Sequence, residues 1–254
     1  MKLTDFTAVM ECIAPNALAL PYDNVGLIIG SSRKQIKKVL VALDCTVETA
    51  NEAVSTGCDL MLTHHPLFFD PVKRLLPGDP DADAAFMLIR HDIALFCAHT
   101  NLDAALGGVN DCLAELLGLV DVTPLPEQNL GRIGIAEQMP IMEFASKTAR
   151  LLRTTVRVVD GHVPVKRVAL VGGAGGSDIY AAAAIGADTF VTGEAKHHQA
   201  LYARHSCINL IVAGHYETER IVLLPLIERL QRDTDDVQYN LTRFDIPVLT
   251  AVAP

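Results

Sequence analysis

The segment from Lys38 to Thr63, KVLVALDCTVETANEAVSTGCDLMLT, contains the pattern that decides the fold. It begins with a continuous apolar run over residues 38–43, which predicts a strand buried on both faces of a sheet. Helical spacing of apolar residues follows as far as Gly57, and a second strand is expected over 59–63. Because buried strands that alternate with helices are typical of largely parallel sheets, the sequence predicts an α/β fold.

The same alternation continues along the chain. Helical spacing returns over 82–90, a third buried strand is expected over 93–98, and a helix is expected over 110–117. The Pro-bearing stretch TPLP at 123–126 then interrupts the pattern. We therefore place a domain boundary near residue 125.

An internal repeat extends this organisation to the second half of the chain. Residues 38–63 align without a gap with residues 167–192, RVALVGGAGGSDIYAAAAIGADTFVT. The identical pairs are Val39/Val168, Ala53/Ala182, Gly57/Gly186, Asp59/Asp188 and Thr63/Thr192. General likeness between any two strand–helix–strand units is the alternative explanation. We expect two similar α/β lobes, the first formed by residues 1–125 with 217–254 and the second by residues 126–216.

Composition excludes several classes of protein. Half of the 254 residues are apolar and a fifth are charged, which excludes intrinsic disorder. The net charge of -9 counts against nucleic acid as a partner, because phosphate binding needs clustered cations. One basic cluster exists, Arg33, Lys34, Lys37 and Lys38, and a solvated helix face explains it equally well.

The chain also lacks the marks of membrane or secreted proteins. No stretch reaches the roughly 18 apolar residues of a membrane span, and the N-terminus does not resemble a secretory signal. The six cysteines are scattered and form no CxxC pair, so they are interpreted as small buried side chains in a reducing compartment. We expect a cytoplasmic protein with no membrane partner.

The strongest local chemical signal is Thr63-His64-His65-Pro66. The two histidines directly follow a predicted buried strand, and α/β folds place their sites at the carboxyl ends of strands. Imidazole suits several transition metals. A pair of surface histidines in a loop is the alternative interpretation of this dipeptide.

Three further metal-competent residues also follow predicted strands. Asp103 lies beyond the strand at 93–98, and His215 and Glu219 lie beyond the apolar run at 210–213. Taken alone, Asp103 could cap a helix and Glu219 could favour a helix N-terminus. Together with the histidine pair, the three form a nitrogen and oxygen ligand set that suits two divalent ions of zinc, iron, manganese or nickel, which remain indistinguishable.

Two more polar residues are candidates for supporting or catalytic roles. His99 follows the strand at 93–98, and Glu194 occupies the place of His65 in the repeat. Each is a candidate for proton transfer or for orienting a ligand. His99 could also be a ligand itself or simply a polar strand end, and a solvated helix position explains Glu194 equally well. The glycine-rich turn Gly172–Gly176 lacks both nucleotide-binding registers, so anion binding and close backbone packing both stay open.

Six separated motifs together carry a family resemblance. They are YDNVGL at 22–27, THHPL at 63–67, AHTNLD at 98–103 with GGVN at 107–110, GGAG at 172–175, TGEAK at 192–196 and GHY at 214–216. The chain resembles the NIF-three-like family, often labelled GTP cyclohydrolase I type 2 homologues. The resemblance implies two α/β lobes, a dinuclear metal centre in the cleft between them, and a toroidal homohexamer. The ligands it implies are His64, His65, Asp103, His215 and Glu219.

Three residues depart from the pattern of the family. Tyr22 stands where members usually carry Trp, Glu194 stands where Asp is frequent, and Thr218 stands where Ser is common. None of the three removes an implied ligand. The family label implies that water opens the purine ring of GTP, whereas no residue in this sequence marks a guanine pocket.

Our leading hypothesis is therefore a dinuclear-metal hydrolase that acts on a nucleotide-like or phosphorylated small molecule. The alternative is a non-enzymatic protein that stores, delivers or senses metal, or that serves as a regulatory scaffold. Both hypotheses use the same ligands, so the ligand set does not separate them.

Overall fold

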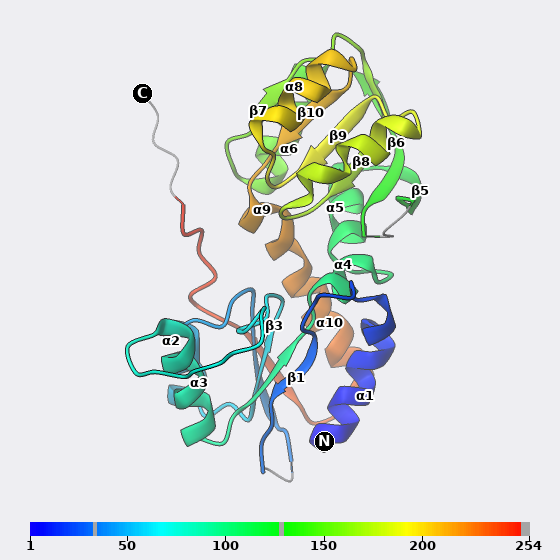
Figure 1. The fold of residues 1–254 in the computed structure, drawn as a ribbon. Helices are drawn as coiled ribbons and strands as arrows, with labels where there is room; N and C mark the ends of the chain where they lie inside the picture. Colours follow the sequence, from blue (N-terminus) through cyan, green and yellow to red (C-terminus); the bar gives the residue numbers. More distant parts are fainter. Residues whose placement is uncertain (33–34, 127–129, 250–254) are drawn as a thin grey trace. The chain divides into compact units, whose positions relative to one another are not determined.

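A computed structural model describes residues 1–32, 35–126 and 130–249, so Arg33 and Lys34 of the basic cluster lie outside the described residues. The chain folds into two compact units (Figure 1). Unit 1 comprises Met1–Leu106 and Leu223–Ile246, and unit 2 comprises Gly107–Val222 with residues 247–249.

Unit 1 is built on a five-stranded sheet in the order β1-β4-β3-β2-β11. The four strands from β4 to β11 run parallel, and β1 pairs with β4 in the antiparallel direction. The bounds are β1 (Gly26–Ile29), β2 (Lys38–Ala42), β3 (Leu60–Thr63), β4 (Ala94–Cys97) and β11 (Gln238–Leu241). Every residue of β3 and β4 is buried, as expected for strands covered on both faces.

Helices cover both faces of this sheet. Ala50 and Ala53 of α2 and Leu88 of α3 pack in one apolar cluster with residues of the sheet such as Leu40 and Met61. On the other side, Phe6 of α1 contacts Phe96 edge to face, and α10 contacts β2 and β11. The helices are α1 (Leu3–Ile13), η1 (Asn16–Leu18), α2 (Val47–Ser55), α3 (Pro80–Arg90), α4 (Thr100–Ala104) and α10 (Leu223–Asp233).

Unit 2 is built on a six-stranded sheet in the order β5-β6-β8-β9-β10-β7. Its three strands β8, β9 and β10 are parallel, and β5, β6 and β7 pair in the antiparallel direction on either side of them. The bounds are β5 (Val120–Pro124), β6 (Arg132–Met139), β7 (Arg157–Val159), β8 (Val165–Val171), β9 (Thr189–Thr192) and β10 (Asn209–Val212).

Helices also cover the two faces of this second sheet. Leu113 of α5 and Phe144 of α6 share one apolar cluster with Val168 of β8. Ile179 of α7 and Ala203 of α8 share the other apolar cluster of this sheet. The helices are α5 (Val109–Leu117), α6 (Ile141–Leu152), η2 (Gly175–Asp178), α7 (Ile179–Ala184), α8 (His197–His205), α9 (His215–Glu219) and η3 (Arg220–Val222).

The predicted repeat is visible in individual hydrogen bonds. The carboxylate of Asp59 accepts bonds from the backbone N–H groups of Lys37 and Lys38, and that of Asp188 accepts bonds from Lys166 and Arg167 in the same way. Both aspartates follow a glycine with positive φ that ends a helix. The predicted α/β class with two similar halves is therefore confirmed.

The antiparallel strands at the flanks of both sheets were not expected. They include β5 at residues 120–124, which pairs with β6 and places the segment before residue 125 in the second sheet. The compact units divide between Leu106 and Gly107 and between Val222 and Leu223. The lobes expected from the sequence, 1–125 with 217–254 and 126–216, stay a prediction about folding domains.

Two expectations about the environment of the chain can be compared with the structure. Within the described ranges, no helix combines the length and the apolar character needed to cross a membrane. All six cysteines are free thiols. Cys45, Cys58 and Cys97 are buried as expected, whereas Cys12 and Cys207 are exposed.

The buried Glu52 of α2 fastens the end of the C-terminal strand to unit 1. Its carboxylate accepts hydrogen bonds from Thr242 Oγ1, from the Arg243 backbone at 3.0 Å and from Arg243 Nε at 2.8 Å. Burial alone would raise the pKa of Glu52, but these donors outweigh burial and lower the pKa. A lowered folded-state pKa stabilises the fold above the ordinary glutamate pKa and loses that effect as the pH falls through the folded value.

We predict that Glu52→Gln lowers the free energy of unfolding by about 1–3 kcal/mol at pH 7, because it removes a charged acceptor from a buried site. Urea unfolding followed by circular dichroism measures this loss. The difference from the wild type should shrink at pH values below about 4. Glu228→Gln, at an exposed position of α10, is the matched control. Equal stability of the Glu52 variant and the wild type at pH 7 would contradict the assignment.

Candidate metal centre

The polar residues of unit 1 gather at the edge where its parallel strands end. His64 and His65 follow β3, and His99 follows β4. Asp44 follows β2, and Asp23 precedes β1, whose first residue pairs with the last residue of β4. Since parallel strands end on the same edge of a sheet, five side chains from four strands share one neighbourhood.

The backbone turn after β3 brings both histidines to this edge. Thr63 Oγ1 donates a hydrogen bond to the His65 carbonyl oxygen at 2.9 Å, which curls the chain directly after the strand. The rings of His64 and His65 then lie 5.0 Å apart between centroids. The chain thus leaves strand geometry here, as the sequence requires if both imidazoles are to face one site.

His99 completes a cluster of three imidazoles. Its ring centroid lies 5.2 Å from that of His64 and 5.6 Å from that of His65. One ring nitrogen of each histidine lies within 4.8 Å of one ring nitrogen of each of the others. Three imidazole nitrogens at this spacing could hold a transition-metal ion.

An oxygen atom at Nδ1 fixes each ring of the cluster. His64 Nδ1 lies 2.9 Å from the Ala98 carbonyl oxygen, and His65 Nδ1 lies 2.8 Å from Asp44 Oδ1. His99 Nδ1 lies 2.9 Å from Asp23 Oδ1. Because these oxygens accept, each Nδ1 carries a proton and donates it, which leaves Nε2 of the neutral ring as an electron-pair donor.

The Asp23 carboxylate is itself held in the charged form. It is buried and accepts hydrogen bonds from the Thr100 backbone at 3.0 Å, from Thr100 Oγ1 and from His99. Burial opposes ionisation, but the bonds from His99 and Thr100 outweigh it and lower the pKa of Asp23 to about 2. The anion therefore stays in place to orient His99 throughout the physiological pH range.

His64 and Asp103 face each other in an arrangement that a shared proton or a cation would stabilise. His64 Nε2 lies 3.6 Å from Asp103 Oδ1, and the His64 side chain is fully buried. A neutral ring that donates through Nδ1 has its lone pair on Nε2, and an ionised carboxylate is also an acceptor. A proton or a metal ion between these two atoms satisfies both, so the pair fits a metal site.

The candidate residues of unit 2 also lie where parallel strands end. Glu194 follows β9, and His215 and Glu219 are the first and last residues of α9, which follows β10. His215 Nδ1 lies 2.9 Å from Glu194 Oε1, and His215 Nε2 lies 3.1 Å from Glu219 Oε2. An imidazole between two carboxylates, with Glu219 buried, is again an arrangement that a cation at Nε2 would satisfy.

The glycine-rich turn after β8 makes room for these two residues. Gly173 has a φ of +60°, and a Cβ at this position would lie 2.0 Å from Glu219 Oε1 and 3.3 Å from His215 Nε2. The backbone N–H of Gly173 donates to Thr218 Oγ1 at 3.0 Å, and that of Gly172 donates to Asn110 Oδ1 at 2.8 Å. The structure therefore favours close packing over anion binding as the reason for glycine at 172 and 173.

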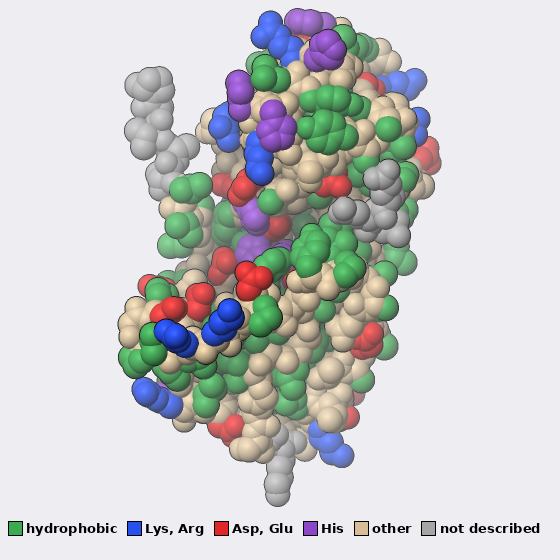
Figure 2. Space-filling model, viewed as in Figure 1, with side chains coloured by type: hydrophobic (Ala, Val, Ile, Leu, Met, Phe, Trp, Pro, Cys, Tyr) green, Lys and Arg blue, Asp and Glu red, His purple; other side chains and the backbone are tan. Residues whose placement is uncertain are grey.

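Glu194 has the position that the repeat predicts for it. Thr192 Oγ1 donates to the Glu194 carbonyl oxygen at 3.5 Å, just as Thr63 Oγ1 donates to that of His65. The neighbouring Lys196, His197 and His198 are exposed, and Figure 2 shows histidine and basic side chains on the surface of this unit. Glu194 contacts His215 through its carboxylate.

Asp23 and Asp44 are the functional candidates that the sequence interpretation missed. Asp44 follows a predicted buried strand, so the rule that selected Asp103 and His215 could have found it. Asp23 gave no such signal, because it precedes its strand and reaches the edge only through the antiparallel direction of β1.

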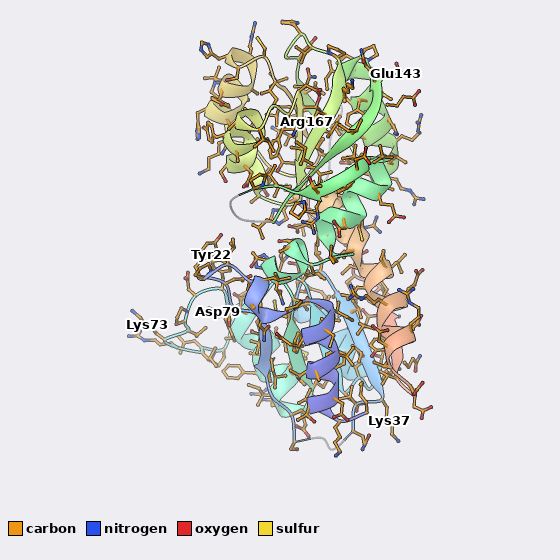
Figure 3. All side chains as sticks on the ribbon, turned by 90° about the vertical axis from the view of Figure 1, so that its right-hand side faces the viewer. Tyr22, Lys37, Lys73, Asp79, Glu143 and Arg167 are labelled. Carbon is orange, nitrogen blue, oxygen red and sulfur yellow. The ribbon has the colours of Figure 1, made fainter. Side chains whose placement is uncertain are left out.

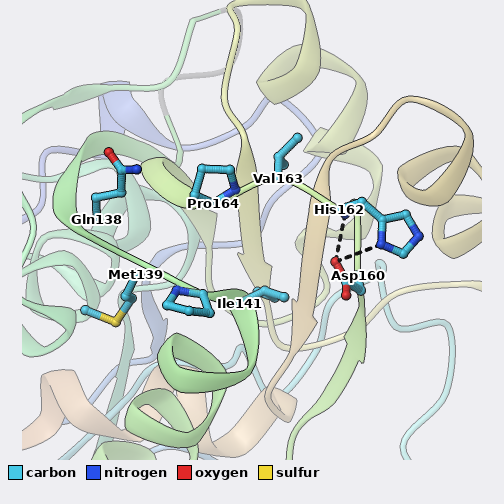
Figure 4. Close-up of a pocket in the computed structure, with 8 residues that line it drawn as sticks. Gln138, Met139, Ile141, Asp160, His162, Val163 and Pro164 are labelled. Carbon is cyan, nitrogen blue, oxygen red and sulfur yellow. Dashed lines mark hydrogen bonds and ion pairs between the residues drawn. The ribbon is translucent and has the colours of Figure 1, made fainter.

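A surface hollow of about 500 Å³ in unit 2 lies away from Glu194, His215 and Glu219 (Figure 4). It borders the starts of β8 and α6, opposite the edge at which the parallel strands end. Its lining residues are Gln138, Met139, Pro140, Ile141, Asp160, His162, Val163 and Pro164. They include none of the seven candidate site residues, so the hollow is not assigned to the candidate centre.

We predict that Gly173→Ala weakens metal binding by about tenfold or more, because the added methyl group forces the Glu219 carboxylate to move. Titration against a chromogenic chelator measures the affinity. Gly186→Ala is the matched control, since its φ is also positive (+78°) but its Cβ meets only Arg167 Nη1 at 4.0 Å. Equal metal affinity of the two variants would show that the close approach to Glu219 is immaterial.

Comparisons with known proteins identify the family of this chain. A model of the Duf34/NIF3 (NGG1p interacting factor 3) family matches residues 1–249. A Clostridium perfringens protein named GTP cyclohydrolase 1 type 2 homolog is 34% identical over 253 residues, which cover 96% of this chain and 97% of that protein. NIF3-like protein 1 of Drosophila melanogaster is 31% identical over 229 residues, which cover 86% of this chain and 78% of that protein.

A solved structure is also similar to this chain over its whole length. The crystal structure of the Staphylococcus aureus hypothetical protein SA1388 has a TM-score of 0.91 with this chain and a sequence identity of 29%. The match covers 99% of each chain. The chain therefore belongs to the Duf34/NIF3 (NGG1p interacting factor 3) family.

Proposed function

We propose that the protein binds two divalent transition-metal ions and acts as a metal-dependent hydrolase of a nucleotide-like or phosphorylated small molecule. One observation carries the proposal: His64, His65 and His215 each have an oxygen acceptor at Nδ1, which leaves Nε2 as the atom that would bind a metal. The ligands that we assign are His64, His65 and Asp103 of unit 1, and His215 and Glu219 of unit 2.

The donor set supports borderline divalent ions. Imidazole nitrogen and carboxylate oxygen bind zinc, iron, manganese and nickel, and a carboxylate can bridge two ions. We propose a dinuclear centre, as the family resemblance implies. Bound there, the metal would supply Lewis-acid chemistry that activates water and stabilises negative charge in the transition state.

His99 is our candidate for proton transfer. Its Nδ1 donates to the Asp23 carboxylate, so its Nε2 can accept the proton that an attacking water loses. The anionic Asp23 would stabilise the imidazolium that forms. This assignment makes Asp23 a positioning residue that acts through His99.

Glu194 acts in our proposal through His215. Its carboxylate accepts a hydrogen bond from His215 Nδ1 at 2.9 Å and thereby orients the ring toward Glu219. Asp44 does the same for His65 in unit 1. A carboxylate that holds a ligating imidazole raises its basicity and strengthens metal binding.

The choice of substrate class follows from the relatives. Several of them bear the name GTP cyclohydrolase 1 type 2 homolog, and that name refers to water opening a purine ring. The backbone N–H groups of Gly172 and Gly173 do not favour phosphate binding, because side-chain oxygens of the protein accept hydrogen bonds from both. We therefore base the substrate class on the relatives, and we base the hydrolytic reaction on ligands that would hold water-activating metal ions.

The assembly and the compartment are parts of the same proposal. The family resemblance implies a toroidal homohexamer, which sedimentation of the purified protein can test. Six free thiols are consistent with a reducing cytoplasm. A net charge of -9 argues against nucleic acid as the partner.

We predict that His65→Ala and His215→Ala each lower the metal content from about two ions per chain by at least one ion, because each removes a ligand. Both side chains are partly exposed, so neither substitution leaves a buried cavity. His162→Ala, at an exposed histidine of unit 2, should keep the wild-type content. Elemental analysis with a protein assay measures the ratio.

The same variants also separate the two hypotheses about activity. The metal-loaded wild type should hydrolyse GTP or another member of a panel of nucleotides and sugar phosphates, and both variants should lose that activity. Full metal content in both variants would contradict the ligand assignment. Metal binding without turnover of any compound would instead favour a non-enzymatic metal-binding protein.

A further inference from the structure

Two exposed aromatic side chains lie together on unit 1. Tyr22 and Phe69 have ring centroids 6.1 Å apart and an interplanar angle of 54°. Tyr22 is 65% exposed and Phe69 is 46% exposed. Figure 3 shows Tyr22 on the segment before β1, at the end of unit 1 where the parallel strands finish. Aromatic surface that stays exposed and grouped, as it does here, is typical of binding sites.

The backbone on both sides of the pair is fixed. Asp23, the residue after Tyr22, is held by His99 and Thr100 through its buried carboxylate. Asn24 Nδ2 donates to the carbonyl oxygen of Phe68 at 2.6 Å, which joins the segment of Tyr22 to that of Phe69. The two rings therefore extend from a rigid base, and a ligand can stack on them at a small cost in conformational entropy.

The aromatic pair borders the histidine cluster directly. The ring of Phe69 packs edge to face against the imidazole of His99, with 6.2 Å between centroids and an angle of 85°. His99 in turn contacts His64 and His65. A molecule that covers Phe69 and Tyr22 consequently has its next atoms beside the imidazoles.

We propose that Tyr22 and Phe69 form an aromatic shelf that stacks the planar heteroaromatic ring of the substrate next to the histidine cluster. This inference rests on the proposed function and narrows its substrate class to compounds with such a ring. Stacking on exposed aromatic side chains recognises bases of any kind, because every base has a π face. The shelf thus supplies ring affinity, and the cluster supplies the chemistry.

A small molecule fits the shelf better than a protein partner does. A protein surface that covered both rings would also cover His99 and close the candidate centre to substrate. A planar ring needs only the area of the two side chains. The polar hydroxyl of Tyr22 at the rim also suits a ligand with one face in water.

Binding of 2-aminopurine riboside to the purified full-length chain tests the shelf. Stacking quenches the fluorescence of this purine, and the chain contains no Trp that would interfere. We expect saturable quenching by the wild type. Tyr22→Ala and Phe69→Ala should weaken binding by about tenfold, in the range found when single stacking side chains are removed. Tyr22→Trp and Tyr22→Phe should retain it.

A control variant and a second readout make the result specific. Tyr180→Ala removes an exposed tyrosine of unit 2 and should bind the purine like the wild type. The metal content of the Tyr22 and Phe69 variants should be unchanged, since neither residue is a ligand in our assignment. Measuring purine binding in both metal-loaded and chelator-treated protein separates failure of the shelf from failure of the metal site.

Three results would overturn the shelf. The first is the absence of quenching by the wild type at millimolar purine, and the second is equal affinity of the wild type and both alanine variants. The third is a change in the sedimentation of Tyr22→Ala or Phe69→Ala, which would identify the pair as a contact between copies of the chain.

Discussion

The hydrogen bond from an imidazole Nδ1 to a fixed oxygen is the interaction on which the candidate site depends. It occurs at His64, His65, His99 and His215, with distances of 2.8–2.9 Å. Such a bond selects the tautomer, fixes the plane of the ring and directs the remaining lone pair. The carboxylates that make three of these bonds stand at the ends of strands or immediately beside them. The fold therefore determines the chemistry of the site through the places where its strands end.

The duplicated strand–helix–strand unit explains why each half carries a similar set of groups. Asp59 and Asp188 close the two copies with matching backbone hydrogen bonds. His65 and Glu194 then occupy equivalent positions after the middle strand, and the two differ in chemistry. His65 has a ring nitrogen that we propose as a metal ligand, whereas the Glu194 carboxylate contacts the ring of His215. Equivalent positions of the repeat thus carry a candidate ligand in one half and a candidate supporting carboxylate in the other.

Much of this could be predicted from the sequence, and the limits have physical causes. Continuous apolar runs indicated β2, β3, β4, β8 and β10, because strands that are buried on both faces carry apolar residues at successive positions. The antiparallel strands β5 and β7 escaped prediction because neither contains a buried residue and because their pairing is set by tertiary contacts. Asp23 was missed for a similar reason, as its place at the site depends on the direction of β1.

Glycine patterns and aromatic residues were harder to interpret from sequence than charged ones. The turn at Gly172 and Gly173 resembles a phosphate loop in composition, yet its N–H groups bind side chains of the protein and its missing Cβ makes room for Glu219. Tyr22 occurs in a motif of the family resemblance, but its exposure and its contact with Phe69 emerge only from the structure. Both cases show that the neighbour of a residue decides its role.

The most direct test of the account is the metal content of wild-type protein purified without an affinity tag or chelator, expressed per chain. The five assigned ligands, three of which are imidazoles with anchored rings, predict about two transition-metal ions per chain. Protein that contains no metal and takes up none when zinc, manganese or iron is added would contradict the account. The anchored histidines would then have a structural role alone.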